Sequence, residues 1–438
     1  MIPARLIVKK RDGGSLTEGE WAAFFEGYLA GEVKEYQVAA LLMAIYFQGL
    51  DPAETHALTR IMMESGERWT WSAEGGPVGD KHSTGGVGDK VSLILAPLCA
   101  ACGVRVPMVS GRGLGHTAGT LDKLETIPGL RTDLEKDDYD RLLREVGFAM
   151  GGQTGTFAPL DRETYALRDV TGTIESIPLI TASIMSKKLA EGLDGLVLDV
   201  KWGDGAFLRE RERAEELARS MIEVGESFGV RTEALLTDME SPLGRTVGHA
   251  LELKEAVEVL KGRDPEPRLL EVTTALAERL LVLTGAAPGE DEARRAVREA
   301  LEGGAAFAKL VAMVRAQGGD PGPIEDPDRL PQPPCRLEIE APRDAVLAGL
   351  PARRVGRLLI ELGGGRRIKG EEIDRAVGLV FPRAVGDRLA AGEPWAVIHA
   401  RDRSGAEEAR RVLESIVAWS DEPVALRPAV TARIARDR

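Results

Sequence analysis

Apolar residues at helical spacing run through the first 65 residues of the chain. The clearest stripe recurs every three to four positions and consists of Trp21, Phe24, Phe25, Tyr28 and Leu29. Thr17 and Glu20, three residues apart, stand just before it and predict a capping box at a helix start. We therefore expect a small helical unit whose apolar faces need a partner to cover them.

The pattern changes after residue 72, where glycines become dense. Short apolar runs such as 104–109 and 193–201 alternate with helical stretches, which predicts an α/β layer with a mostly parallel sheet. The helical stretches that we expect lie at 160–192, 208–228, 248–262, 268–285 and 291–316.

A break in composition separates the last hundred residues from the rest. Residues 317–335 are rich in Pro, Gly and Asp, so they cannot form a long helix or a central strand and predict a linker. Beyond it, residues 336–438 carry short β-like runs and many glycines. We expect a small, strand-rich α+β domain there.

Length and charge narrow the class of protein. A chain of 438 residues is too long for one compact core. Its net charge of −13 argues against general nucleic-acid binding, which needs a basic face. The longest apolar run, 91–104, is interrupted by Pro97 and is too short to span a bilayer. The first residues hold no apolar segment of a signal peptide, so we expect a cytoplasmic protein without membrane partners.

Three cysteines do not make a disulfide framework. Cys99 and Cys102 form a C-x-x-C pair inside the apolar run, at the spacing of one helix face. Packing is the favoured interpretation of this pair, with redox or metal chemistry as the alternative.

The first glycine-rich loop covers residues 80–90, DKHSTGGVGDK, and leads into the apolar run. Glycines let the backbone approach a ligand, and loop amides before a helix start attract anions. Lys81 and Lys90 add positive charge, and Ser83 and Ser92 add hydroxyl groups. The loop matches neither the Walker A pattern nor G-x-G-x-x-G. A tight turn with polar surface residues is the alternative interpretation.

A second glycine-rich loop, 110–120, follows the β-like run 104–109. The carboxyl end of a strand is where α/β proteins bind ligands. Two such loops about 30 residues apart predict a shared phosphate or nucleotide site.

A third cluster lies on predicted helices. Tyr165 and Arg168 are three residues apart, and Ser183 and Lys187 are four apart, so each pair shares a helix face. A guanidinium, an aromatic ring and an ammonium suit the carbonyl edge of a heterocycle. The spacing alone favours an ordinary solvated face.

Five histidines offer few catalytic candidates. His82 stands out because it lies in the first loop beside Lys81, and its near-neutral pKa range suits proton transfer or hydrogen bonding. His116, in the second loop, is equally a structural hydrogen-bonder. We expect structural or exposed roles for His56, His249 and His399. No sequence motif predicts a catalytic transition metal.

Four segments together closely resemble the pyrimidine-nucleoside phosphorylase and thymidine phosphorylase family. They are DKHSTGGVGDK (80–90), SGRGLGHTAGTLDKLE (110–125), YALRDVTGTIESIPLITASIMSKKLAEG (165–192) and DVKWGDGAF (199–207). The resemblance implies a homodimer formed through a helical domain, and reversible phosphorolysis of thymidine, deoxyuridine and uridine to free base and pentose 1-phosphate. It implies no organic cofactor and inorganic phosphate as co-substrate.

The resemblance also implies a division of the chain. Residues 1–65 and 160–190 would form the helical, pyrimidine-binding domain. Residues 70–155 and 191–330 would form the α/β phosphate-binding domain, followed by the C-terminal domain at 336–438. Substrates would bind in the cleft between the first two domains.

Site residues follow position by position from the same resemblance. The residues implied to bind phosphate are Lys81, Ser83, Ser92, Ser110 and Thr120. The residues implied to bind the pyrimidine are Tyr165, Arg168, Ser183 and Lys187. His82 would lie beside base and sugar, and the implied catalytic groups are His82, Arg168 and Lys187.

Two positions depart from the family pattern. Some members hold a potassium ion at positions matching Gly88, Lys90, Leu243, Thr246 and Glu255. Lys90 stands where those members have a small hydroxyl residue, so its ammonium could pair with Glu255 in place of the ion; the sequence leans against potassium. Met108 cannot hydrogen-bond a ribose 2′-hydroxyl, which favours deoxyribonucleosides.

Two other functions compete with phosphorolysis. A phosphoribosyltransferase resembling the anthranilate enzyme shares the two-domain plan, and a requirement for magnesium would favour it. A non-catalytic nucleotide or phosphate sensor on the same fold would bind without turnover.

Overall fold

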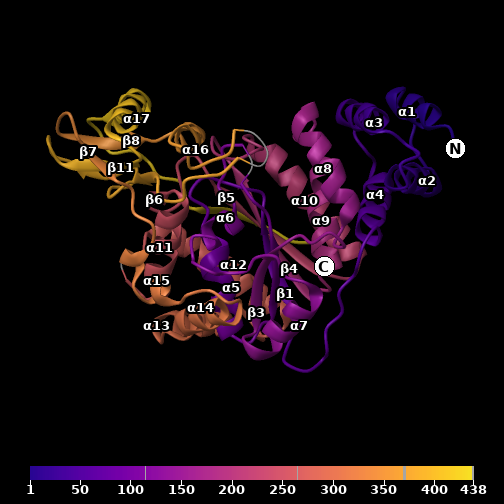
Figure 1. The fold of residues 1–438 in the computed structure, drawn as a ribbon, viewed down its shortest axis with the longest axis horizontal. Coiled ribbons are helices and arrows are strands. Elements are labelled where there is room, and N and C mark those ends of the chain that lie inside the picture. Colours follow the sequence, from indigo (N-terminus) through magenta and orange to yellow (C-terminus); the bar gives the residue numbers. More distant parts are fainter. Residues whose placement is uncertain (114, 264, 368–370, 437–438) are drawn as a thin grey trace.

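The chain forms three parts in a row (Figure 1), with helices at one end, a strand-containing centre and a second strand-rich part at the other end. The computed structural model describes residues 1–113, 115–263, 265–367 and 371–436. Leu114 of the second predicted loop, and residues 368–370 and 437–438 of the predicted C-terminal domain, lie outside the described residues.

The helical part has a core of its own. Buried residues between Leu6 and Met62 pack together with Leu160, Leu179 and Ala182, in a cluster separate from the main core. The predicted capping box is confirmed, because the Thr17 side chain accepts from the Glu20 N–H and Glu20 accepts from the Thr17 N–H. The helices that share this cluster are α1 (Pro3–Arg11), α2 (Glu18–Leu29), α3 (Glu35–Gln48), α4 (Pro52–Glu64), α8 (Pro159–Thr171) and α9 (Ile177–Ala190).

The central sheet is mostly parallel, as predicted. Strands β1 and β5 each pair in parallel with β4, and β2 pairs in parallel with β3 beside them. A parallel bridge between Val78 and Arg105 joins the two groups. The strands are β1 (Gly79–Ser83), β2 (Val106–Ser110), β3 (Phe148–Gly152), β4 (Gly195–Trp202) and β5 (Arg231–Asp238).

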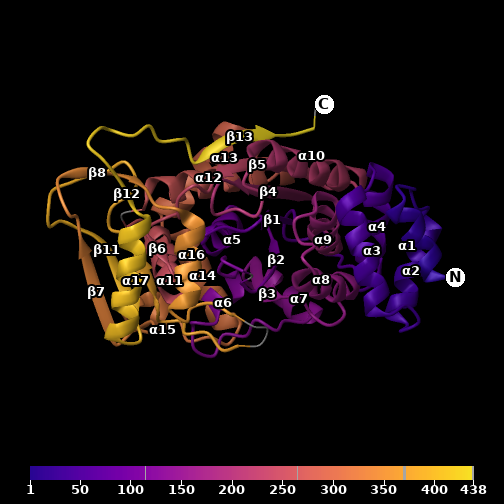
Figure 2. The ribbon, with the colours of Figure 1, turned by 90° about the horizontal axis from the view of Figure 1, so that it is seen from above.

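Helices follow the strands and cover this sheet (Figure 2). They are α5 (Val91–Ala101), α6 (Thr120–Leu124), α7 (Lys136–Glu145), α10 (Arg211–Ser227), α11 (His249–Leu260), α12 (Pro267–Thr284), α13 (Glu290–Glu302) and α14 (Ala305–Ala316). The parallel order brings the carboxyl ends of β1, β2 and β4 to one edge, where the glycine-rich loops begin.

The C-terminal part contains two small antiparallel sheets, with strand orders β6-β9-β11-β7 and β10-β8-β12. Short helical turns fill the predicted linker, at α15 (Gly322–Glu325) and the 3₁₀ turn Pro327–Arg329. The other elements are β6 (Thr246–Val247), β7 (Cys335–Glu340), β8 (Ala345–Gly349), α16 (Ala352–Glu361), β9 (Gly378–Val380), β10 (Arg388–Leu389), β11 (Pro394–Ala400), α17 (Arg403–Ile416) and β12 (Ala418–Ser420).

One predicted boundary is wrong. The prediction placed all of 336–438 in the C-terminal domain, but β13 (Val430–Ile434) returns to the central sheet and pairs antiparallel with β5. The pairing covers the outer edge of β5, whose N–H and C=O groups would otherwise lack partners in the sheet. Conversely, β6 comes from the middle of the chain and completes the C-terminal sheet. The two parts therefore exchange a strand.

Candidate active site

The first glycine-rich loop leaves the carboxyl end of β1 and enters α5, the strand-to-helix junction that the sequence predicts. Inside it, the Ser83 hydroxyl donates to Asp89 over 2.6 Å, and the Gly85 N–H donates to Ser83 over 3.2 Å. Gly85 has a φ of +96°, a conformation that favours glycine. The loop is thus folded back on itself by its own polar groups.

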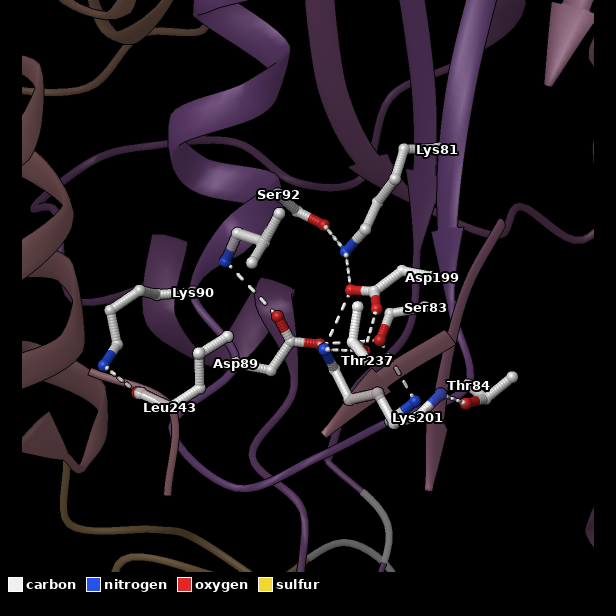
Figure 3. A network of polar contacts seen from close by, with 12 residues as sticks. Lys81, Ser83, Thr84, Asp89, Lys90, Ser92, Asp199, Lys201, Thr237 and Leu243 are labelled. Atoms are coloured by element: carbon white, nitrogen blue, oxygen red, sulfur yellow. Dashed lines mark hydrogen bonds and ion pairs between the residues drawn. The ribbon is translucent and has the colours of Figure 1, made fainter. Parts of the chain in front are cut away.

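A buried network of charges lies beneath this loop (Figure 3). The Lys81 ammonium lies 3.4 Å from both the Ser92 hydroxyl and the Asp199 carboxylate. Lys201 also pairs with Asp199, at 2.8 Å, and approaches Asp89 at 3.7 Å. Asp199 and Lys201 are two residues apart on β4, so their side chains lie on the same face of the sheet. The last side chain of β1, which pairs with Asp199 in the sheet, lies on that face too.

The nearby ammonium groups control the acidity of Asp89. Burial alone would raise the pKa of its carboxyl, but Lys201, Lys81 and Lys123 together lower it far below the usual range. Asp89 is therefore ionised at all ordinary pH values. Several ammonium groups therefore lie close together at this end of the cleft, which suits it to binding an oxyanion.

The second loop begins where β2 ends, at Ser110, and α6 begins at Thr120. Asp122, which is 1% exposed at its side chain, accepts from the Gly113 N–H over 2.8 Å. Its two oxygens also accept from both terminal nitrogens of Arg366, over 3.0 and 2.7 Å. Arg366 belongs to the C-terminal part, so that part braces the second loop.

The third cluster lies on α8 and α9. The Lys187 ammonium pairs with Asp161 and also donates to the Ser183 hydroxyl over 3.1 Å. Asp161 is buried, and its other oxygen has no hydrogen-bond partner among the described residues. The ion pair holds the ammonium in place while leaving polar atoms at the cleft.

Arg168 is the most buried member of this cluster, at 1% exposed. Its guanidinium donates to the carbonyl groups of Thr173, Ile174 and Leu179, and lies 5.6 Å from the centre of the Tyr165 ring. Burial lowers the pKa of Arg168 to about 10 and raises that of Tyr165 to about 12, so Arg168 stays charged and Tyr165 neutral.

A single cleft of about 840 Å³ is lined by both predicted clusters. The predicted site residues that line it are His82, Ser83, Ser92, Ser110, Thr120, Tyr165, Arg168, Ser183 and Lys187. Lys81 is not in the lining but stands behind Ser92. Met108 is 1% exposed on β2 and also lies outside the lining, so its placement does not support direct contact with a sugar.

Other lining residues were not predicted. Asp89, Arg112, Gln153, Asp161 and Lys201 all face the cleft. The sequence held one usable signal for Lys201, because Asp199 and Lys201 alternate along a buried strand and charged residues are rarely buried without a partner.

His82 lies at the cleft, between the two clusters. Burial, together with the ammonium groups of Lys188, Lys187 and Lys81, lowers the pKa of its imidazole well below 6.5. The ring is therefore neutral at pH 7 and carries one N–H donor. It suits hydrogen bonding better than the delivery of a proton from an imidazolium.

The domains of known families match this chain in the same order as the three structural parts. Residues 4–66 match the "Glycosyl transferase family, helical bundle domain" and residues 75–307 the "Glycosyl transferase family, a/b domain". Residues 346–419 match the "Pyrimidine nucleoside phosphorylase C-terminal domain". The chain belongs to this glycosyl transferase family.

Relatives within the glycosyl transferase family span the whole chain. A thymidine phosphorylase of Sinorhizobium medicae is 46% identical over 435 residues, covering 99% of both chains. A pyrimidine-nucleoside phosphorylase of Staphylococcus haemolyticus is 45% identical, covering 94% of this chain and 95% of its own. A thymidine phosphorylase of Burkholderia cenocepacia is 47% identical, covering 93% and 94%.

The family fold extends to a more distant solved structure. Anthranilate phosphoribosyltransferase from Thermus thermophilus superposes with a TM-score of 0.58 at 22% identity, covering 71% of this chain and 98% of its own. At that identity the likeness concerns the fold alone.

The two cysteines of the C-x-x-C pair are packed in or against the main core and have the properties of apolar side chains. Cys99, Cys102 and Cys335 are free thiols, and burial raises the pKa of Cys99 well above its usual range and that of Cys102 to about 11. Both thiols of the pair stay protonated and unreactive. Among the described residues, no group of three or more His, Cys, Asp or Glu side chains could hold a metal, and no helix is long and apolar enough to cross a membrane.

His116 and His249 make structural contacts. His116 shares a hydrogen bond with the Gly205 carbonyl at 2.8 Å, and His249 with the Gly364 carbonyl at 2.7 Å. His116 therefore joins the second loop to the segment after β4.

The place where the resemblance implies a potassium ion is filled by a side chain of the protein itself. The Lys90 ammonium lies 2.8 Å from the Leu243 carbonyl, 3.0 Å from the Thr246 carbonyl and 2.8 Å from Glu255. These oxygens are the ones that an ion would need, so the residues present do not fit one.

Proposed function

We propose that this protein catalyses the reversible phosphorolysis of pyrimidine nucleosides to the free base and a pentose 1-phosphate. One observation carries the proposal: the glycine-rich loops, which suit a phosphate, and the cluster on α8 and α9, which suits a heterocycle, line the same cleft. The relatives named thymidine and pyrimidine-nucleoside phosphorylase support it along the whole chain.

The reaction needs no nucleophile from the protein. A phosphate oxygen attacks C1′ of the sugar, the C1′–O bond forms, and the C1′–N1 bond breaks with its electron pair passing to the base. Ser92, Ser110 and Thr120 supply hydroxyl donors for the phosphate, whereas the Ser83 hydroxyl would first have to leave Asp89. Lys201 supplies positive charge at the cleft, and Lys81 supplies it behind Ser92. Anionic phosphate also stabilises the positive charge that develops at C1′.

The departing pyrimidine gains negative charge on its carbonyl edge. Lys187, held by Asp161, and Arg168 stabilise this charge, and the neutral His82 donates a hydrogen bond. Losing one such preorganised donor typically costs about 3 kcal/mol of barrier. Tyr165 and Ser183 orient the ring.

Phosphate and base contact different parts of the chain, so closure of the cleft would complete the reacting geometry. Support comes from the separate core of the helical part, to which α8 and α9 contribute. Small-angle scattering with phosphate and a non-reactive pyrimidine nucleoside should give a smaller radius of gyration than the free protein. An unchanged radius would contradict closure.

The protein should act as a homodimer through its helical part. Among the described residues, seven of the nine large hydrophobic side chains that are exposed belong to the first 47 residues. They are Met1, Ile2, Val8, Leu29, Tyr36, Tyr46 and Phe47. A second copy of the same surface would cover them. The free cysteines fit a reducing cytoplasm.

Turnover of thymidine, deoxyuridine and uridine, each with and without phosphate, tests the proposal. Release of thymine and uracil that requires phosphate is the expected result. Release without phosphate would indicate a hydrolase, and binding without release would indicate a sensor. A preference for the deoxyribonucleosides would agree with the Met108 prediction, although the effect would have to act through neighbours of this buried side chain.

A further inference from the structure

Lys90 sits at the start of α5 with its side chain fully buried and all three N–H groups matched. Its acceptors are two backbone carbonyls and one carboxylate, at 2.8 to 3.0 Å. Glu255 is in turn held in place, because it also accepts from the Arg245 N–H over 2.7 Å and from the Thr246 hydroxyl over 2.5 Å. Carbonyl and carboxylate oxygens are the ligands that replace the hydration shell of a potassium ion.

The surroundings of the ammonium are tightly packed. A Cβ on Gly244 would come within 2.6 Å of the Lys90 nitrogen, and a Cβ on Gly88 within 2.5 Å of the Leu243 carbonyl. An additional cation on the same oxygens would also be repelled by the ammonium at that separation. We call the oxygens of Leu243, Thr246 and Glu255 around the ammonium the cage, and this cage fits one positive charge.

The cage joins the phosphate loop to the segment that carries Leu243 and Thr246. In the sequence, Lys90 lies between Asp89, which holds the Ser83 hydroxyl, and Ser92, which lines the cleft. The Lys90 side chain extends away from both of them toward Leu243 (Figure 3). The Leu243 N–H also donates to the Val87 carbonyl over 3.0 Å. The Lys90 contacts and this hydrogen bond therefore both hold the last part of the loop, residues 87–90, against that segment.

We propose that Lys90 is a built-in substitute for a monovalent cation, which makes the phosphate loop independent of potassium. Removing the ammonium but keeping the oxygens creates a vacant site with an unpaired, nearly buried carboxylate, which a potassium ion then occupies. The inference rests on the proposed function only for its kinetic readout.

The experiment compares the natural protein with Lys90→Thr in potassium chloride, sodium chloride and tetramethylammonium chloride at equal ionic strength. Two quantities are measured in each salt: the midpoint of thermal unfolding and the KM for phosphate. The natural protein should give the same values in all three salts. Lys90→Thr should unfold at a lower temperature and show a KM raised about tenfold or more, and potassium should reverse both changes.

Lys254→Thr is the matched control. Lys254 precedes Glu255 on α11, but its side chain is 42% exposed and pairs with Asp328 at the surface. Its replacement should leave both quantities insensitive to potassium.

Two results would overturn the proposal. One is a potassium requirement of the natural protein, which needs no variant to detect and so decides the question even if Lys90→Thr does not fold. The other is a folded Lys90→Thr protein whose midpoint ignores potassium. Thermal midpoints do not need turnover, so absence of phosphorolysis in every salt would sink the proposed function and leave this inference decidable.

Discussion

At the scale of single residues, the ion pair between Lys187 and Asp161 makes the sharpest prediction. Lys187→Gln removes the charge that would stabilise the leaving pyrimidine, so kcat/KM for thymidine should fall by about 10²- to 10³-fold. Asp161→Asn keeps the ammonium but loosens its position, and should lower kcat/KM by a smaller factor. Steady-state phosphorolysis in excess phosphate measures both.

Lys254→Gln provides the comparison, since it removes an exposed ammonium far from the cleft lining. It should leave kcat/KM unchanged. Equal losses for Lys187→Gln and Lys254→Gln would mean that Lys187 has no special role in the transition state.

The lowered pKa of His82 predicts a pH effect on stability. Unfolding restores its ordinary value near 6.5, so between the two values the unfolded chain binds more protons than the folded one. The free energy of unfolding should therefore fall as the pH drops below 6.5. In His82→Gln, the thermal midpoint should fall less between pH 7 and pH 5 than in the natural protein.

His399→Gln separates this stability effect from catalysis. His399 is buried outside the cleft, and burial lowers the pKa of its imidazole to about 4. Its replacement should also flatten the pH dependence of the midpoint, while thymidine turnover stays intact. If His82→Gln retained full turnover as well, a hydrogen bond from His82 to the substrate would be contradicted.

Sequence patterns alone pointed to the two glycine-rich loops, because polar side chains packed among glycines are unusual. Ser83 and Thr120 could be found this way, whereas the spacing of Tyr165 and Arg168 favoured a solvated face and only the resemblance gave them a role. Asp161 was missed because one carboxylate on a helix has no distinguishing pattern. Its importance arises from α9, which brings Lys187 against it.

At the scale of elements, the C-terminal part braces the second glycine-rich loop. Weakening this brace should therefore affect the binding of phosphate more than the binding of thymidine. Arg366→Lys replaces a two-pronged contact with Asp122 by a single point charge. Because Asp122 also holds the Gly113 N–H, the loop should loosen, and KM for phosphate should rise by about tenfold. KM for thymidine should change much less.

Arg367→Lys is the neighbouring control, because the Arg367 side chain does not contact Asp122 and is exposed. It should leave both constants unchanged. A rise in KM for thymidine equal to that for phosphate in Arg366→Lys would show general disruption rather than support of one loop.

Element boundaries were less predictable than element types. The expected helical stretch 291–316 is divided into α13 and α14 at Gly303 and Gly304, where Gly304 has a φ of +74°. The return of β13 to the central sheet could not be predicted either. Pairing with β5 depends on which sheet edge is open, and a local pattern of five residues does not encode that.

At the scale of the whole molecule, the helical part has two features that go beyond forming its own small core. It contributes α8 and α9 to the cleft, and its first helices expose large apolar side chains. Phe47 is 76% exposed and Tyr36 73% exposed. Burying a large apolar side chain contributes about 1.5–3 kcal/mol, so a dimer that covers several of them would be stable.

The proposed dimer predicts that charge on this surface separates the subunits. Phe47→Glu combined with Tyr36→Glu should shift the mass measured by sedimentation from two chains to one at micromolar concentration. Leu426→Glu, an equally drastic change at a 56% exposed leucine far along the chain, should leave two chains together.

Because none of the three residues lines the cleft, any loss of turnover that accompanies dissociation would show that the partner steadies α8 and α9. A natural protein that sediments as one chain would contradict the dimer, and full turnover by the separated chains would show that each cleft works alone.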